Sequence, residues 1–125
     1  MAKHIKILGK GNSSILLDKE AISNFLQEVT TKLNLTSLGE PIIHNIPFNS
    51  NNIEGDDFMN EGGVTGVLIL STSHCAIHTW PLKQEFNIDI YSCKKFNKEV
   101  AVKFVSDFFQ CYQIKVSDLT SSTDW

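Results

Sequence analysis

Ser73 and Cys93 are two nucleophilic side chains that the sequence predicts to lie together. Residues 74–80 and 86–92 read as two strands around a turn at residues 81–85, which favours an antiparallel hairpin. In such a pair the numbers of opposing residues have a constant sum, here about 165 or 166. Cys93 then falls opposite residue 72 or 73, so Ser73 and Cys93 meet at the open end of the hairpin.

Two histidines on the first of these strands, His74 and His78, leave three kinds of site open. The first is purely structural, a hairpin with a serine, a cysteine and two hydrogen-bonded histidines. The second is a metal site, but four strand positions separate the histidines by about 13 Å, which is too far for one zinc ion. The third is a Ser–His or Cys–His hydrolase with Asp89 as the orienting acid, although no nucleophile-elbow motif surrounds Ser73.

Two blocks of sequence around these residues resemble the small prokaryotic S-adenosylmethionine decarboxylases, which are pyruvoyl enzymes of polyamine synthesis. Residues 63–81 read GVTGVLILSTSHCAIHTWP, and residues 89–93 read DIYSC. The family signature runs G-V-S-G-V, then E-S-H-x-x-I-H-T-W-P-E, then D-x-x-x-C, and its blocks have the same spacing here without gaps. The length and the helix after the hairpin also fit, so the resemblance implies a single decarboxylase domain over residues 1–125.

The resemblance implies a proenzyme that cleaves itself between Thr72 and Ser73 into fragments 1–72 and 73–125. Ser73 then becomes the pyruvoyl group that forms a Schiff base with the substrate amine. Neither a metal nor pyridoxal phosphate is expected, because the pyruvoyl carbonyl serves as the electron sink. The expected enzyme is a carboxy-lyase that is made as a zymogen.

The resemblance also implies roles for single residues. His78 matches the family histidine that assists processing as the base for the Ser73 Cα proton, and Cys93 matches the proton donor in decarboxylation. The implied substrate is the small molecule S-adenosylmethionine, whose decarboxylation supplies the aminopropyl donor for spermidine synthesis. The family stacks the adenine on aromatic rings, whose faces contribute contact area and quadrupole attraction. The residues that match substrate-binding positions are Trp80, Phe58 or Met59 as its stacking partner, Thr65 in place of a serine, and His74.

Two residues depart from the family pattern, Thr72 and Leu82, where the family has glutamate. Thr72 precedes the cleavage site, where a β-branched side chain is expected to slow cleavage by crowding. Leu82 cannot accept the hydrogen bonds that the glutamate of the W-P-E motif accepts from the ribose, a loss of about 1–3 kcal/mol. Glu85, three residues further on, is a candidate to replace that glutamate.

Two alternative functions stay open. A relative that decarboxylates arginine or ornithine by the same chemistry would need no ribose contact, and acidic loop residues would hold its cationic tail. An unprocessed, non-catalytic homologue would keep the fold without the cleavage. The acidic residues of the loop are Glu54, Asp56, Asp57 and Glu61.

The elements that position these residues predict an α+β fold, a two-layer sandwich of one mostly antiparallel sheet with helices on one face. A helix over 19–33 has Asp18 as its N-cap and an apolar stripe at helical spacing, and a second helix runs from Asn97 to about residue 110. Since the other sheet face needs cover, we expect a homodimer with four layers, helix, sheet, sheet and helix. The expected strands cover residues 14–17, 41–48, 64–71, 75–80, 86–91 and 112–116, and a long polar loop covers 49–63.

Composition excludes several classes of protein. The 125 residues are 42% hydrophobic and carry 11 basic and 14 acidic side chains, which argues against a disordered chain and against a nucleic-acid binder. The sequence predicts no membrane span and no secretory signal. Three cysteines match no zinc pattern and fit a reducing, cytoplasmic compartment, with Cys75 and Cys111 as small hydrophobic core residues.

Overall fold

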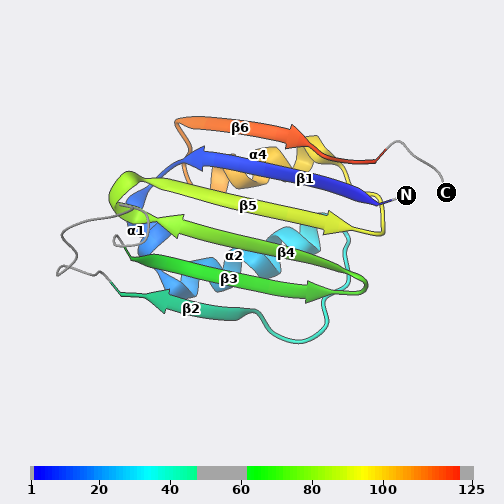
Figure 1. Ribbon diagram of the computed structural model, residues 1–125, viewed down its shortest axis with the longest axis horizontal. Helices are drawn as coiled ribbons and strands as arrows, with labels where there is room; N and C mark the ends of the chain where they lie inside the picture. Colours follow the sequence, from blue (N-terminus) through cyan, green and yellow to red (C-terminus); the bar gives the residue numbers. More distant parts are fainter. Residues whose placement is uncertain (1, 48–61, 122–125) are drawn as a thin grey trace.

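The computed structural model describes residues 2–47 and 62–121, which form one six-stranded sheet with helices on one of its faces (Figure 1). All neighbouring strands are antiparallel, in the order β2-β3-β4-β5-β1-β6, so the predicted α+β sandwich is confirmed. The strands are β1 (Lys3–Lys10), β2 (Ile42–Ile46), β3 (Gly63–Leu70), β4 (Ser73–Trp80), β5 (Glu85–Ser92) and β6 (Gln113–Asp118). The helices are α1 (Ser13–Leu17), α2 (Lys19–Lys32) and α4 (Lys98–Phe108), and the 3₁₀ turn η1 (Pro81–Lys83) joins β4 to β5.

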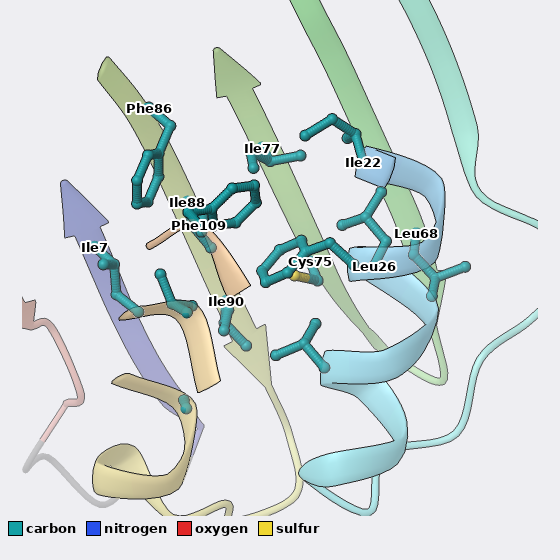
Figure 2. Close-up of a cluster of buried hydrophobic side chains, with 14 of the residues drawn as sticks. Ile7, Ile22, Leu26, Leu68, Cys75, Ile77, Phe86, Ile88, Ile90 and Phe109 are labelled. Carbon is teal, nitrogen blue, oxygen red and sulfur yellow. The ribbon is translucent and has the colours of Figure 1, made fainter. Parts of the chain in front are cut away.

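Apolar side chains at alternate strand positions face the helices and form the core (Figure 2). Successive side chains of a strand point to opposite faces, so β4 buries Cys75 and Ile77 and turns its even-numbered residues to the other face. The helices complete this layer with apolar stripes that include Phe25 of α2 and Val105 of α4, both fully buried. The core therefore fixes which face each residue of the β4–β5 hairpin occupies.

Both long helices begin where the sequence predicts. The Asp18 carboxylate accepts hydrogen bonds from the backbone N–H groups of Glu20 and Ala21, and the Asn97 side chain accepts one from Val100. These bonds satisfy N–H groups that have no partner within the helix. None of the helices in the described part of the chain has the length and hydropathy of a membrane span.

Two parts of the predicted fold are wrong at the N-terminal end. The pattern predicts a strand over residues 14–17, but these residues belong to α1, because the Asn12 side chain accepts hydrogen bonds from the N–H groups of Ser14 and Ile15 and starts a helical turn. Strand β1 has no counterpart among the predicted strands, although its Ile5 and Ile7 alternate with lysine and are fully buried. β1 pairs with β5 and β6, both more than 70 residues away in sequence, so no local turn signal marks it.

The sheet face opposite the helices is left uncovered by the described residues (Figure 1). We call it the open face. It exposes apolar side chains among polar ones, with Ile69 at 48% and Tyr91 at 38% exposure. A sheet face of this size with exposed apolar residues is typical of an interaction surface.

Candidate active site

The β4–β5 hairpin has the register that the sequence predicts. Opposing residue numbers sum to 165 along the whole pair, from His74 opposite Tyr91 to Trp80 opposite Glu85. This register brings Cys93, the residue after β5, to the start of β4. The two nucleophilic side chains therefore meet at the open end of the hairpin, as expected.

Hydrogen bonds connect the turn before β4 with Cys93. The Cys93 backbone N–H donates to Ser73 Oγ at 2.9 Å, and Ser73 Oγ donates to the Ser71 carbonyl oxygen at 3.1 Å. Thr72 Oγ1 lies 2.7 Å from Cys93 Sγ and 2.8 Å from the Ser71 carbonyl oxygen. The bond predicted to be cleaved thus lies within one compact cluster of hydroxyl, carbonyl and thiol groups.

Thr72 holds its backbone in the left-handed region, with a φ of 51°. It is the second residue of a two-residue turn whose flanking residues, Leu70 and Ser73, are paired. Hairpin turns of this length favour positive φ, but for a residue with a Cβ the left-handed region costs about 1–2 kcal/mol. The residue that replaces the family's glutamate is therefore strained as well as in contact with Cys93.

The three cysteines are free thiols that differ in acidity. Hydrogen bonds with Thr72 and Ser73 hold the pKa of the exposed Cys93 thiol below its ordinary value. Burial raises the pKa of Cys75 to about 12 and the pKa of Cys111 to about 11. Because the thiolate is the reactive form, Cys93 is the reactive thiol of the three. Cys75 is a core residue and Cys111 packs against the core, as predicted.

A cavity of about 180 Å³ opens beside this cluster. The Ser71 N–H donates to the Thr36 carbonyl oxygen at 3.1 Å, which fixes the backbone of the turn against the chain that follows α2. Lys94 brings a positive charge to the wall, and its ammonium donates to the Asn34 carbonyl oxygen at 2.7 Å. We call this cavity the hairpin pocket, and its lining residues are Leu35, Thr36, Leu70, Ser71, Ser73, Ser92, Cys93 and Lys94.

A second set of predicted site residues, Thr65, His78 and Trp80, lies on the open face. Thr65 Oγ1 and His78 Nδ1 are 3.1 Å apart, between directly opposite residues of β3 and β4. The ring centroids of His78 and Trp80 are 6.5 Å apart. We call these three residues the open-face group.

The hairpin pocket and the open-face group lie on opposite faces of the sheet. Ser73 belongs to the helix side, with Cys75 and Ile77, whereas His78 belongs to the open face. Five strand positions also separate Ser73 from His78, a distance of about 16 Å. Within one chain, the structure therefore does not bring His78 to the Ser73 Cα proton that it is predicted to remove.

His74 and Asp89 form a third cluster, also on the open face. The two oxygens of Asp89 lie 2.8 Å from Nε2 of His4 and 2.8 Å from Nε2 of His74, whose ring stacks on Tyr91. Burial raises the pKa of Asp89, but the hydrogen bonds from His74 and His4 outweigh burial, and the pKa lies below its ordinary value. Asp89 faces away from Ser73, so the two residues do not form part of a hydrolase triad.

His4 is the member of this cluster that the sequence analysis missed, because β1 was not predicted. The signal that would have found it is the alternation of His4, Lys6 and Leu8 with buried isoleucines. In residues 2–47 and 62–121, no group of three or more histidine, cysteine or acidic side chains is arranged to hold a metal ion.

Glu85, rather than Leu82, lies beside the predicted stacking residue. Leu82 is 66% exposed in η1, whereas Glu85 lies directly opposite Trp80 across the hairpin. The Glu85 carboxylate is 3.7 Å from the Lys10 ammonium, and both residues line a second cavity of about 180 Å³ over β5, β1 and β6. The predicted stacking partners and the acidic loop residues lie outside the described residues, namely Phe58, Met59, Glu54, Asp56, Asp57 and Glu61.

Comparison with known proteins decides the family. The sequence model of S-adenosylmethionine decarboxylase matches residues 5–122. The chain belongs to the S-adenosylmethionine decarboxylase family. It is 30% identical to the S-adenosylmethionine decarboxylase proenzyme of Thermodesulfovibrio yellowstonii over 101 residues, 80% of this chain. The proenzyme of Archaeoglobus fulgidus is 29% identical over 77% of this chain, and that of Pyrococcus furiosus is 40% identical over 46%.

The matched stretches cover only part of these family members. The chain spans 64% of the T. yellowstonii protein, 74% of the A. fulgidus protein and 42% of the P. furiosus protein. The crystal structure of the adenosylmethionine decarboxylase from Aquifex aeolicus superposes with a TM-score of 0.71, over 99% of this chain and 96% of that one. At 22% identity, that likeness establishes the fold.

Proposed function

We propose that this chain is a self-processing, pyruvoyl-dependent S-adenosylmethionine decarboxylase that works as a homodimer. The observation that carries the proposal is the contact between Cys93 N and Ser73 Oγ, at 2.9 Å, beside the hairpin pocket. These residues stand at the motif positions of the pyruvoyl precursor and the proton donor. The relatives quoted above are named S-adenosylmethionine decarboxylase proenzymes, which supports this substrate over arginine or ornithine.

Maturation in this proposal begins with the Ser73 hydroxyl. Ser73 Oγ attacks the carbonyl carbon of Thr72, so an ester forms while the peptide bond breaks and the serine nitrogen becomes an amine. Loss of the Ser73 Cα proton then expels the Thr72 carboxylate, which keeps the Oγ atom. One water hydrolyses the remaining enamine, releases one ammonia and leaves a pyruvoyl group at residue 73.

The residues around Ser73 fit a pyruvoyl group. The Cys93 N–H points at residue 73 and donates to Ser73 Oγ, the atom that leaves with Thr72, so after cleavage it would be free to donate to the carbonyl oxygen of a pyruvoyl group. The hairpin pocket leaves space on the same side of the sheet. When present, the pyruvoyl carbonyl supplies a sink for the electrons that carbon dioxide leaves behind. Cys93 then has the role of returning a proton to the substrate carbon.

The open-face group serves the pocket of a second copy of the chain. His78 and Trp80 cannot reach Ser73 of their own chain, because five and seven strand positions, about 16 Å and 23 Å, separate them from it along β4. Cys93 extends past the end of β5 and is exposed, so a partner chain that covers the open face can approach it. In the dimer, His78 of one chain acts as the base for maturation of the other, and Trp80 stacks on the substrate.

The open face supports this assembly by its composition. Exposed apolar residues of β2, β3 and β5 lie there without cover from the described residues, and two such faces would bury each other around a twofold axis. The resulting dimer has four layers, in the order helix, sheet, sheet and helix. The exposed apolar residues of this face include Ile42, Ile46, Ile69 and Tyr91.

An intact mass spectrum of the purified protein tests the proposal. We expect two fragments that meet between Thr72 and Ser73, the second with a blocked, carbonyl-reactive N-terminus, and release of carbon dioxide from S-adenosylmethionine. Ser73→Ala is expected to give one uncleaved chain without activity. Ser71→Ala removes a hydroxyl of the same turn but not the nucleophile, so it should still be cleaved. An active Ser73→Ala variant, or an uncleaved wild-type chain, would overturn the proposal.

A further inference from the structure

We propose that self-cleavage itself turns Cys93 into an acid, because cleavage leaves a carboxylate on Thr72 beside the Cys93 sulfur. The inference rests on the proposed self-processing function. A proton donor must carry its proton when the substrate needs it, so the protonation state of Cys93 after cleavage decides whether it can act. The new negative charge favours the thiol over the thiolate.

Before cleavage, the structure stabilises the thiolate. The Thr72 hydroxyl has one proton and two acceptors, Cys93 Sγ at 2.7 Å and the Ser71 carbonyl oxygen at 2.8 Å. It donates to sulfur when Cys93 is a thiolate, and to the carbonyl when Cys93 carries its own proton. These bonds lower the pKa of the Cys93 thiol in the uncleaved chain. A thiolate cannot return a proton to a substrate carbon, so this state is unsuited to the proposed role.

After cleavage, the new chain end stays close to Cys93. Leu70 is buried at 2% exposure, and the Ser71 N–H is held by the Thr36 carbonyl oxygen at 3.1 Å. The Thr72 carboxylate therefore lies one residue beyond an anchored position. Its carbon is three bonds from Oγ1, which places it no more than about 7 Å from the sulfur in the observed conformation.

The other charges near Cys93 do not change on cleavage. Lys94 lines the hairpin pocket, its ammonium donates to the Asn34 carbonyl oxygen in the uncleaved chain, and cleavage removes neither group. On β4 and β5, His74 and Asp89 point to the open face and bind each other. Tyr91 stacks on His74 at the same face, and Cys75 is buried in the core. The Thr72 carboxylate is therefore the charge that the cleavage adds, and a like charge at this range lowers the thiolate fraction about tenfold at a given pH.

The pH dependence of Cys93 alkylation tests the inference without any activity assay. Processed wild-type protein and uncleaved Ser73→Ala protein are treated with iodoacetamide from pH 5 to pH 10, and the labelled cysteine is quantified by peptide mass spectrometry. Both proteins lack the Ser73 hydroxyl, so its loss does not distinguish them. They differ in the cleaved peptide bond, the pyruvoyl group and the Thr72 carboxylate. We expect the midpoint for Cys93 to lie about one pH unit higher in the processed protein, which is about tenfold less thiolate at pH 7. The midpoint of the pH profile depends on the pKa of the Cys93 thiol and not on how easily iodoacetamide reaches it.

Two Thr72 variants, made in the Ser73→Ala background, test the role of the hydroxyl. Thr72→Val keeps the β-branched shape but removes the donor, so the Cys93 midpoint should rise by several tenths of a pH unit or more. Thr72→Ser keeps the donor and should restore the midpoint of the parent protein.

Each result either supports or overturns the inference. An equal or lower midpoint in the processed protein overturns it while leaving the proposed function intact. A Thr72→Val midpoint equal to that of the parent overturns the assigned role of the hydroxyl. Absence of the two fragments in the wild-type sample overturns the proposed function and this inference together.

Discussion

The hairpin pocket and the open-face group differ in how the chain positions their residues. Cys93 of the pocket is within hydrogen-bond distance of both Thr72 and Ser73, because one local hairpin register places them together. The open-face residues lie in the same motif, and Trp80 is only seven residues from Ser73, yet they face the opposite way. Proximity in a strand motif therefore does not mean proximity in space, since alternate residues serve opposite faces. In the proposed dimer, each chain contributes one half of two sites.

Loss of the pocket thiol should give the largest effect on turnover. Cys93→Ala is expected to lower kcat by about 10²- to 10⁴-fold, because the substrate carbon loses its proton donor. Cleavage between residues 72 and 73 should continue, since the Ser73 hydroxyl remains. Steady-state kinetics and a mass spectrum of the same sample measure the two steps separately.

The matched control for this variant is Cys111→Ala. Cys111 packs against the core and does not line the hairpin pocket, so kcat should be unchanged. A Cys93→Ala enzyme with normal turnover would show that the pocket does not supply the acid.

A smaller effect is expected from the carboxylate beside the open-face group. If Glu85 accepts the ribose hydrogen bonds that Leu82 cannot, Glu85→Gln should raise KM for S-adenosylmethionine about tenfold with little change in kcat. Lys10→Met breaks the ion pair with Glu85 but keeps the carboxylate, so its KM should stay near the wild-type value. Equal KM values for wild type and Glu85→Gln would exclude Glu85 from substrate binding.

The smallest effect concerns the stability of the open face. The folded chain lowers the pKa of Asp89, so its ionised form stabilises the fold above the unfolded pKa of about 4, and this stability is lost as the pH falls through the folded pKa. Asp89→Asn should therefore lower the free energy of unfolding at pH 7 by no more than about 1 kcal/mol, because its carboxylate is 38% exposed and screened by water.

Denaturant unfolding at pH 7 and pH 3, at one fixed protein concentration, measures this difference. The gap between the variant and the wild type should narrow at pH 3, because the stabilisation is lost as the pH falls through the lowered pKa of Asp89. A gap that persists or grows at the lower pH would mean that Asp89 acts through packing and not through its charge.

Local signals made much of the fold and the pocket predictable. Asp18 and Asn97 mark the starts of two helices because their side chains cap them, and the β4–β5 register follows from one short turn. β1 was not predicted, because its partners are distant in sequence, and His4 was missed with it. The separation of His78 from Ser73 follows from their positions on β4. The second copy of the chain that our proposal requires cannot be inferred from the hairpin register.

The central claim, that one site draws on two chains, is tested most directly by mixing two inactive variants. Ser73→Ala lacks the nucleophile, and His78→Ala lacks the base, so each alone should stay uncleaved. Co-expressed, the mixed dimer contains one complete site, formed by Ser73 of one chain and His78 of the other. Random pairing places about half of the His78→Ala chains in mixed dimers, so an intact mass spectrum should show about half of them cleaved. His78→Ala chains that remain uncleaved in the mixture, or that cleave fully on their own, would contradict the account.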